Sequence, residues 1–310
     1  MSLSVAAQSG KLARRAPPVE HDKAWRFATF APAFLMMLVL SILPIANLFW
    51  TSLNHVAWME GQPVWTFVGL DNYMALGGDA LVRAGLINTF IFAAGAVSGQ
   101  MLLGFFLAYL TTRITRARTL YRAIFILPVL IPGIVIGAIW KLMLSADFGL
   151  VNHIISVFAG YFTHDWLGSS ETALLSVIIV DIWHWTPFCF LLFLAGLESL
   201  PQEVFEASKV DGGSAWQELR YITIPLMLPT IVVTFAFRFV LAFKVFDEIY
   251  LLTGGGPGTS SEVISFTLYQ RFFVEDRIGY GSAMSVFIIF VVCLMLAMVL
   301  TVQRRAGSAR

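Results

Sequence analysis

Six long apolar runs restrict the fold of this chain more than any other feature of its sequence. A helix rises about 1.5 Å per residue, so about 20 apolar residues cross the roughly 30 Å hydrocarbon core of a bilayer. Lipid offers no hydrogen bonds to the backbone, and single runs of this length must therefore be helical. We predict an all-α membrane protein with six transmembrane helices, at about Phe27–Trp50, Leu86–Thr111, Ala123–Leu144, Ala173–Leu197, Leu226–Leu252 and Tyr280–Val302.

Composition supports this class and excludes others. Of the 310 residues, 58% are hydrophobic and 13% are charged, with a mean hydropathy of +0.79, whereas soluble domains carry about 25% charged residues. The formal net charge of +1 provides no field that would recruit nucleic acid. Cys189 and Cys293 lie inside apolar runs without the spacing of metal ligands, and four of the five histidines lie outside the predicted spans. We therefore expect no metal site.

Lysine and arginine are unevenly divided between alternate connections, which predicts the orientation. The segment before the first span carries five, the second connection four, the fourth two and the segment after the last span three, whereas the other three connections together carry three. Positive residues stay on the cytoplasmic side. We therefore expect a basic cytoplasmic tail at 1–26, the first transmembrane helix and a periplasmic segment at 27–85, the membrane core at 86–302 and a second cytoplasmic tail at 303–310.

The fourth connection, 198–225, has the pattern of a folded element. Pro201 suits the first turn of a helix, and acidic residues follow it, as the positive end of a helix favours. Asp211-Gly212-Gly213 then ends the helix, because glycine accepts left-handed backbone angles. A second short helical stretch at Ser214–Tyr221 leads to Pro225 and the fifth span. The sequence predicts two short helices joined by a glycine turn at the cytoplasmic surface.

The charge of this connection favours a protein partner. It carries five acidic residues and only two basic ones. An amphipathic helix lying on an anionic lipid surface, which is the alternative interpretation, would carry basic residues along its polar face. We therefore expect this connection to bind a protein in the cytoplasm.

Motifs in and around this connection resemble a known family. Glu206-Ala207-Ser208-x3-Gly212-x9-Ile222-x-Ile224-Pro225 is similar to the EAA motif, E-A-A-x3-G-x9-I-x-L-P, of the membrane subunits of binding-protein-dependent ABC importers. Ser208 and Ile224 depart from the motif by small or isosteric changes. Three further stretches resemble the MalF-like carbohydrate-uptake permeases: F-V-G-L-D-N-Y at 67–73, W-x3-P-F at 183–188, and F-D-x-I-Y-x-L-T-G-G-G-P at 246–257.

The resemblance implies the fold of a type I ABC importer transmembrane domain, in which the connection 198–225 contains the coupling helix that docks on an ATPase. It also implies a second homologous permease subunit, two ATPase subunits and a periplasmic solute-binding protein, all at a bacterial inner membrane. The residues carried over to the coupling role are Glu206, Ala207, Ser208, Asp211, Gly212, Ile222 and Pro225.

The chain itself is expected to be a transport subunit and not an enzyme. The phosphate-binding pattern G-x4-G-K-[ST] is absent, since the only Gly-Lys pair, Gly10-Lys11, is followed by Leu12. We expect no cofactor in this chain, and ATP and Mg bound by the partner ATPase.

Polar residues inside the spans are costly in lipid, so each is a functional candidate. Four residues of the fourth span share one helix face at i, i+3, i+4 and i+7 spacing: Asp181, His184, Trp185 and Phe188. Aromatic rings contact the C–H faces of sugars and polar groups bind their hydroxyls, so this face suits a sugar pathway. The resemblance adds the middle of the fifth span to the substrate pathway, with Arg238, Leu241 and Ala242.

Structural alternatives stay open for the charged residues of these spans. Arg238 can neutralise Asp181 across the helix interface, and if it is unpaired it favours a substrate with a phosphate, sulfonate or carboxylate group. Lys244 can pair with Glu248 at i, i+4.

The sequence thus predicts the permease subunit of an ATP-driven importer that translocates a sugar or sugar derivative by alternating access. The resemblance implies that the substrate is an oligosaccharide, glycoside or polyol, neutral or anionic, that a periplasmic binding protein delivers, and the turn at Gly254–Pro257 is expected where that protein docks. The alternative is a secondary transporter or channel driven by an ion gradient. Such folds commonly carry internal repeats, and we find none here.

Overall fold

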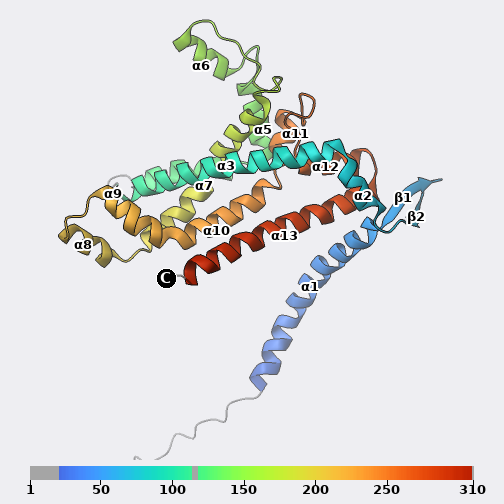
Figure 1. Ribbon diagram of the computed structural model, residues 1–310, viewed down its shortest axis with the longest axis horizontal. Helices are drawn as coiled ribbons and strands as arrows, with labels where there is room; N and C mark the ends of the chain where they lie inside the picture. Colours follow the sequence, from blue (N-terminus) through green and yellow to red (C-terminus); the bar gives the residue numbers. More distant parts are fainter. Residues whose placement is uncertain (1–20, 114–117, 309–310) are drawn as a thin grey trace, which may run out of the picture. The chain divides into compact units, whose positions relative to one another are not determined.

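The computed structural model describes residues 21–113 and 118–308 (Figure 1). Most of the predicted basic tail at 1–26, the side chains of the tail at 303–310, and Arg116 of the second connection lie outside the described residues. The elements, in chain order, are α1 (His21–Ser52), β1 (Asn54–Met59), β2 (Gln62–Phe67), α2 (Asp71–Gly78), α3 (Ala80–Arg113), α4 (Arg118–Ile126), η1 (Leu127–Leu130), α5 (Gly133–Met143), α6 (Leu150–Ala159), α7 (Ala173–Glu198), α8 (Gln202–Val210), α9 (Ala215–Glu218), η2 (Leu219–Thr223), α10 (Ile224–Ala242), α11 (Asp247–Leu252), α12 (Ile264–Tyr269), η3 (Gln270–Val274) and α13 (Ile278–Ser308).

The chain divides into two compact units between Trp50 and Thr51. The first contains nearly all of α1, an apolar helix with large hydrophobic side chains exposed along its length. The second unit contains every other element and both candidate sites. In it, α3, α7, α10 and α13 form a helix bundle in which α3 packs against α7 and α10 packs against the other three (Figure 1).

The predicted six spans are confirmed as far as length and composition can show. Within the described residues, five helical stretches are long and apolar enough to cross a membrane, and a bent pair of helices makes a sixth. The five lie at Ala28–Ser52, Ala80–Arg113, Ala173–Glu198, Ala215–Ala242 and Ile278–Thr301, and the bent pair at Thr119–Leu130 and Gly133–Met143.

The third span is not the straight helix that its apolar run suggested. Its two halves meet at 93°, at a break of two residues. Ile131 and Pro132 have extended backbone angles there. Proline has no N–H to give to the helix and disfavours helical angles in the residue before it, so Pro132 explains the break.

The fifth span is displaced from its predicted limits of Leu226 and Leu252. It begins at Ala215, because α9 continues through the π-helical turn η2 into α10, and it ends at Ala242. In η2 the amide of Ile224 donates to the carbonyl of Leu219. Pro225, which has no N–H for a regular ladder, follows immediately. The short connection 198–225 is therefore continuous with the span that follows it.

The centre of the bundle is the contact between α3 and α7. Phe92, Ala93 and Val97 of α3 are fully or almost fully buried and share a core with Val177 and Val180 of α7. Further along, Gly104 of α3 lies against the backbone of α7, where an added Cβ would come within 2.9 Å of the amide nitrogen of Phe190. Only glycine permits so close an approach of the two helices.

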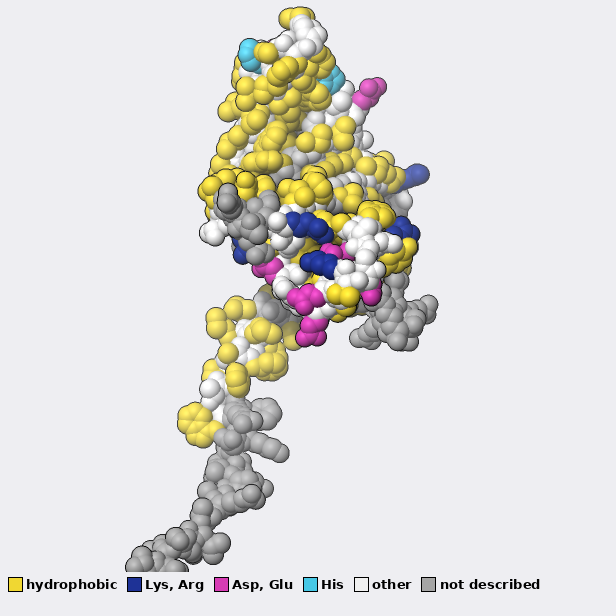
Figure 2. Space-filling model, turned by 90° about the vertical axis from the view of Figure 1, so that its left-hand side faces the viewer, with side chains coloured by type: hydrophobic (Ala, Val, Ile, Leu, Met, Phe, Trp, Pro, Cys, Tyr) yellow, Lys and Arg dark blue, Asp and Glu magenta, His cyan; other side chains and the backbone are white. Residues whose placement is uncertain are grey.

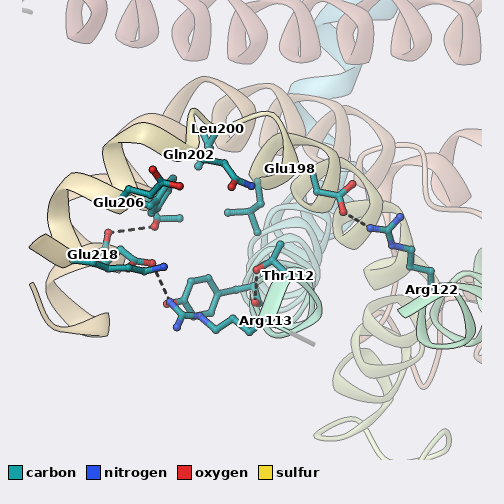
Figure 3. A pocket seen from close by; sticks show the side chains of 13 residues that line it. Thr112, Arg113, Arg122, Glu198, Leu200, Gln202, Glu206 and Glu218 are labelled. Carbon is teal, nitrogen blue, oxygen red and sulfur yellow. Dashed lines mark hydrogen bonds and ion pairs between the residues drawn. The ribbon is translucent and has the colours of Figure 1, made fainter. Parts of the chain in front are cut away.

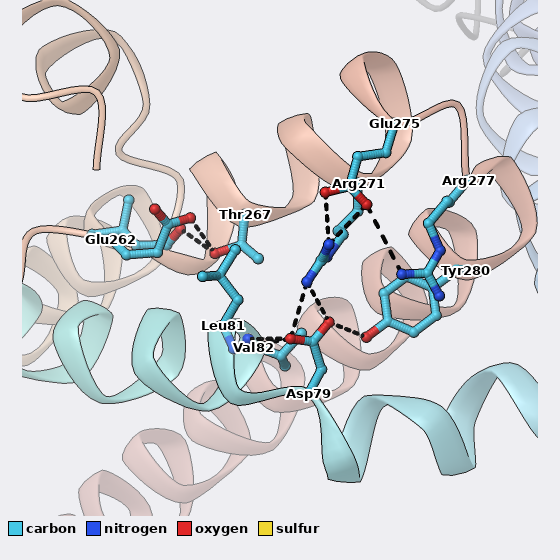
Figure 4. Close-up of polar contacts among 10 residues, drawn as sticks. Asp79, Leu81, Val82, Glu262, Thr267, Arg271, Glu275, Arg277 and Tyr280 are labelled. Atoms are coloured by element: carbon cyan, nitrogen blue, oxygen red, sulfur yellow. Dashed lines mark hydrogen bonds and ion pairs between the residues drawn. The ribbon is translucent and has the colours of Figure 1, made fainter. Parts of the chain in front are cut away.

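The end of the bundle opposite α8 carries the hairpin of β1 and β2, which pair antiparallel, and a polar network around Asp79 (Figure 4). Asp79 caps α3 by accepting from the amide of Leu81 at 2.9 Å. It also accepts from Arg271 at 2.9 Å and from the hydroxyl of Tyr280 at 2.8 Å. Burial raises the pKa of the Asp79 carboxyl, but these donors outweigh burial and hold the pKa below its ordinary value. The network ties α3 to η3 and α13.

Candidate functional site

A polar pocket of about 220 Å³ opens between α7, the end of α10 and the start of α11. Its lining includes five of the seven residues predicted for a substrate pathway and several that were not predicted. The lining residues are Gly133, Asp181, His184, Trp185, Arg238, Leu241, Lys244, Val245, Phe246, Asp247 and Glu248.

Arg238 and Asp181 form a buried ion pair, as the structural alternative for Arg238 foresaw. The guanidinium Nη2 lies 3.3 Å from Asp181 Oδ2, and both side chains are almost completely buried. Gln100 of α3 closes the triangle: its Nε2 donates to Asp181 Oδ2 at 2.6 Å and its Oε1 accepts from Arg238 Nε at 2.7 Å. A buried charge requires such a partner. Gln100 was not predicted from the sequence, because an uncharged amide in an apolar run gives only a weak signal.

His184 and Glu248 form a second buried pair. Nδ1 of His184 lies 3.1 Å from Glu248 Oε1, and Nε2 lies 3.2 Å from the carbonyl oxygen of Ile131 at the break of the third span. The predicted pair of Lys244 with Glu248 is wrong. Residues 243–246 separate α10 from α11, so Lys244 and Glu248 do not share one helix, and the Lys244 side chain is exposed.

Trp185 lines the pocket together with a second aromatic side chain, Phe246. The Trp185 ring lies 4.6 Å from the guanidinium carbon of Arg238, within the range of a cation–π contact. Phe188 stacks edge-on against Trp185 at 6.3 Å between centroids, but it does not line the pocket. Ala242, with 2% of its surface exposed, is part of the core. The structure thus brings Asp181, His184, Trp185, Arg238 and Leu241 together and leaves Phe188 and Ala242 outside.

The pocket does not have the ligands of a metal centre. In the part of the chain that the structure describes, no group of three or more His, Cys, Asp or Glu side chains could hold a metal ion. What the pocket offers instead is two aromatic side chains, Trp185 and Phe246, two aliphatic side chains, Leu241 and Val245, and a set of polar groups. Such a lining can bind an uncharged polar molecule.

The second candidate site is the segment 198–225, here called the coupling segment. Its first helix, α8, begins after Pro201 and ends at Val210, with Asp211 as its C-cap residue. Gly212 has a φ of +74°, which glycine adopts without strain, and the amide of Gly213 donates to the carbonyl of Ser208 at 2.8 Å. This is the helix and glycine turn that the sequence predicted.

A capping box starts the second helix of the coupling segment. The hydroxyl of Ser214 accepts from the amide of Gln217 at 3.3 Å, and the side chain of Gln217 accepts from the amide of Ser214 at 2.8 Å. These reciprocal bonds satisfy free donors at the start of α9. Since α9 continues into α10, the coupling segment is a folded element joined to a membrane span.

Most of the predicted coupling residues gather around one hollow of about 400 Å³. Ala207, Ser208, Asp211, Gly212 and Ile222 all line it. Glu206 instead faces a larger polar pocket of about 660 Å³ on the other side of α8, together with Arg113, Glu198 and Glu218 (Figure 3). Pro225 lies in the first turn of α10.

The outer surface of the coupling segment combines charge with exposed apolar side chains. Val210 is 88% exposed, Tyr221 69% and Trp216 65%. Figure 2 views the end of the bundle that carries α8 and α9, and acidic and basic side chains gather there beside a largely hydrophobic surface. An exposed apolar and acidic surface of this kind is typical of a site where another protein binds.

A multi-pass helical membrane protein with a folded, exposed segment between two of its spans is the class that this fold and these sites define. Residues 100–307 match the family described as "Binding-protein-dependent transport system inner membrane component". The chain belongs to this family.

Individual relatives agree with this assignment. The chain is 36% identical to the trehalose/maltose transport system permease protein MalF of Thermococcus litoralis, over 82% of this chain and 85% of that protein. It is 30% identical to the sulfoquinovosyl glycerol transport system permease protein SmoG of Agrobacterium fabrum, over 86% and 85% of the two chains. It shares its fold with a chain of a bacterial ABC transporter involved in the import of the acidic polysaccharide alginate, with a TM-score of 0.80, 22% identity, and coverage of 92% and 96%.

Proposed function

We propose that this chain is the membrane-spanning permease subunit of an ATP-driven importer of a sugar or sugar derivative. Family membership and relatives named for trehalose, maltose and sulfoquinovosyl glycerol transport support this function. The observation that carries it is the coupling segment, which is folded, exposed and continuous with α10. A rigid segment can transmit the movement of a docked partner to the spans, whereas a flexible loop would absorb it. Nothing in the comparisons supports the alternative of an ion-gradient transporter.

The proposed partner of the coupling segment is an ATPase subunit. Val210, Trp216 and Tyr221 provide exposed apolar anchors, and the coupling segment that carries them has five acidic residues against two basic ones. The complementary surface of the ATPase is therefore partly apolar and partly basic. ATP and Mg are bound by that ATPase and not by this chain.

The complete importer contains further chains. Each chain has one coupling segment, so two ATPase subunits require a second homologous permease subunit. A periplasmic solute-binding protein delivers the sugar in this proposal, and a bacterial alginate ABC transporter with a chain of the same fold was solved in complex with an alginate pentasaccharide-bound periplasmic protein. In this arrangement the chain lies in a bacterial inner membrane with both termini in the cytoplasm.

The polar pocket is the proposed substrate pathway, and its pairing favours a substrate without net charge. Arg238 is neutralised by Asp181, and Glu248 is engaged by His184. The charged side chains left exposed at the pocket are Lys244 and Asp247, which have opposite sign. The pocket therefore has no net excess of positive charge for an anion. An anionic substrate was expected only if Arg238 were unpaired. Arg238 is paired with Asp181, so its charge does not favour an anionic substrate.

Replacement of Gly212 by valine tests the proposed function. Valine is strained at a φ of +74°, so the glycine turn would rearrange and the coupling segment would lose its fixed orientation. We expect binding-protein-dependent uptake to fall by about tenfold or more, since small displacements of positioned groups have large effects on rate. Uptake is measured in cells, and the amount of membrane-inserted protein is measured in parallel.

Gly78→Ala is the matched control for this experiment. Gly78 has open space around it and no positive φ, so alanine fits there. Undiminished uptake by Gly212→Val at normal protein levels contradicts the coupling role of the segment.

A further inference from the structure

The coupling helix α8 is held mainly at its ends. None of its residues is buried, and the polar pocket of about 660 Å³ lies between α8 and the ends of the neighbouring spans (Figure 3). A movement of α8 is therefore passed on chiefly through the two ends of the coupling segment. Covalently, these ends lead to α7 and α10.

The first end is also joined to the third span. Glu198, the last residue of α7, forms an ion pair with Arg122 of α4, and both side chains are about one third exposed. A carboxylate at the C-terminus of a helix is disfavoured by the helix dipole, so Glu198 benefits from a cation beside it. Arg122 is that cation.

The second end is joined to the second span. Glu218, the last residue of α9, accepts from Nη2 of Arg113 at 3.1 Å, and Arg113 is the last residue of α3. The guanidinium of Arg113 lies 4.6 Å from the ring centroid of Tyr109 and also donates to the hydroxyl of that residue. Tyr109 thus orients Arg113 toward the coupling segment. The two ion pairs therefore attach the two ends of the coupling segment to different spans. The Glu198 pair attaches the first end to α4, and the Glu218 pair attaches the second end to α3.

We propose that Arg113, Arg122, Glu198 and Glu218 are positioning residues of the transport cycle, whose two ion pairs carry movement of the coupling segment to α3 and α4. The inference rests on the proposed function. The pairs are partly exposed, with 46% of the Arg113 side chain and 15% of the Glu218 side chain accessible in one and about one third of each side chain in the other. Partly exposed pairs contribute little to folding stability, so their removal should affect transport more than the fold.

The third span connects the Arg122–Glu198 ion pair to the polar pocket. α4 leads through η1 to the break at Ile131 and Pro132. The carbonyl of Ile131 lies within hydrogen-bonding distance of His184, and Gly133 lines the pocket. Continuous contacts therefore join the cytoplasmic end of α4 to the candidate substrate pathway.

Charge reversal and charge swap test the proposal in the reconstituted complex with ATPase subunits and binding protein. The single variants are Glu218→Arg and Arg122→Glu, and the swaps add Arg113→Glu and Glu198→Arg respectively. We expect each single variant to lower the sugar transported per ATP hydrolysed about fivefold or more, and each swap to restore it to within about twofold of wild type. Copurification of the ATPase should stay unchanged in all of them.

Arg83→Glu is the control, because Arg83 is an exposed cation at the start of α3, outside the coupling segment, and no ion pair joins it to another described residue. It should leave the ratio of sugar to ATP unchanged. Swaps no better than the single variants, or an equal loss in Arg83→Glu, would overturn the inference while leaving the proposed function intact. Failure of the wild-type chain to copurify with any ATPase would instead contradict the proposed function.

Discussion

The buried charges of the bundle are arranged as closed pairs. Arg238, Asp181 and Gln100 satisfy one another, and His184 bridges Glu248 and the broken third span. These contacts join α3, α7, α10, α11 and the break. The polar groups at the pocket are therefore held by the fold before any substrate arrives, and pre-organised groups of this kind lower the cost of binding.

Removal of one partner of the Arg238 pair should be strongly destabilising. In Asp181→Asn the guanidinium of Arg238 stays buried without its carboxylate, and breaking a buried pair in this way costs about 3–5 kcal/mol. The midpoint of thermal unfolding of the purified protein in detergent measures the loss. The double variant Asp181→Leu with Arg238→Met should recover most of it, because it removes both charges. An Asp181→Asn protein as stable as wild type would show that the pair is not needed for the fold.

A buried carboxyl outside the spans provides a pH-dependent prediction. Glu262, 3% exposed, accepts a hydrogen bond from Thr267 at 2.7 Å. Burial raises the pKa of Glu262, although Thr267 and the charge of Arg271 act against the rise. The folded state therefore binds the proton more tightly than the unfolded state, and stability falls as pH rises from the ordinary pKa of 4.5 through the raised one.

Glu262→Gln removes this pH-dependent loss of folding stability, because glutamine does not ionise. The variant should therefore unfold at a higher temperature than wild type at pH 7. The advantage should shrink as pH falls toward 4, where wild-type Glu262 is protonated. The test compares the midpoint temperatures of unfolding of Glu262→Gln and wild type across this pH range. Glu60→Gln, at the exposed turn of the hairpin, is the control and should show no such trend. A difference between Glu262→Gln and wild type that does not depend on pH contradicts the explanation.

At the scale of elements, the sequence predicted which segments form helices better than where those helices break. The apolar run Ala123–Leu144 predicted a span, but the 93° bend depends on how the backbone responds to Pro132 and on what packs beside it. The early start of the fifth span depends on the π-helical turn before Pro225. The pair of His184 with Glu248 could not be predicted for the same reason, since it requires the chain to leave α10 at Ala242.

The coupling segment was the element best predicted, because its signals are local. Pro201 precedes α8 and Gly212 takes left-handed angles in the turn after it, both as predicted, whereas the capping box at Ser214 was not predicted. Each of these follows from the residue and its immediate neighbours and not from tertiary packing. The exposed position of the segment means that little tertiary packing competes with those local preferences.

Ser214→Ala should loosen the second helix of the coupling segment without affecting the bundle. Loss of an N-cap costs about 1 kcal/mol, which corresponds to roughly fivefold faster opening of the capped turn. The rate of hydrogen exchange in peptides covering 212–223 measures this opening of the capped turn directly. Ser199→Ala, which removes only a hydroxyl that donates to Gly196, is the control and should leave this exchange unchanged. Equal exchange in Ser214→Ala and wild type contradicts the role of the capping box.

At the scale of the whole molecule, the charged surface and the polar pocket lie in different parts of the bundle. The spans present large apolar side chains to their surroundings, and charged side chains gather at the end that carries α8 and α9 (Figure 2). The polar pocket lies among α7, α10 and α11, away from that end. The proposed sugar-binding pocket and the proposed ATPase-docking segment therefore lie on different parts of one chain, and in this account the spans between them connect the two events.

Uptake into proteoliposomes tests this account most directly. The chain is reconstituted with its second permease subunit, the ATPase and the loaded binding protein, and accumulation of labelled sugar is followed with ATP inside the vesicles. The account predicts accumulation against the concentration gradient only when ATP and all the partners are present, and none from the chain alone under an imposed proton or sodium gradient. Uphill uptake by the chain alone, driven by an ion gradient without ATP, would contradict it.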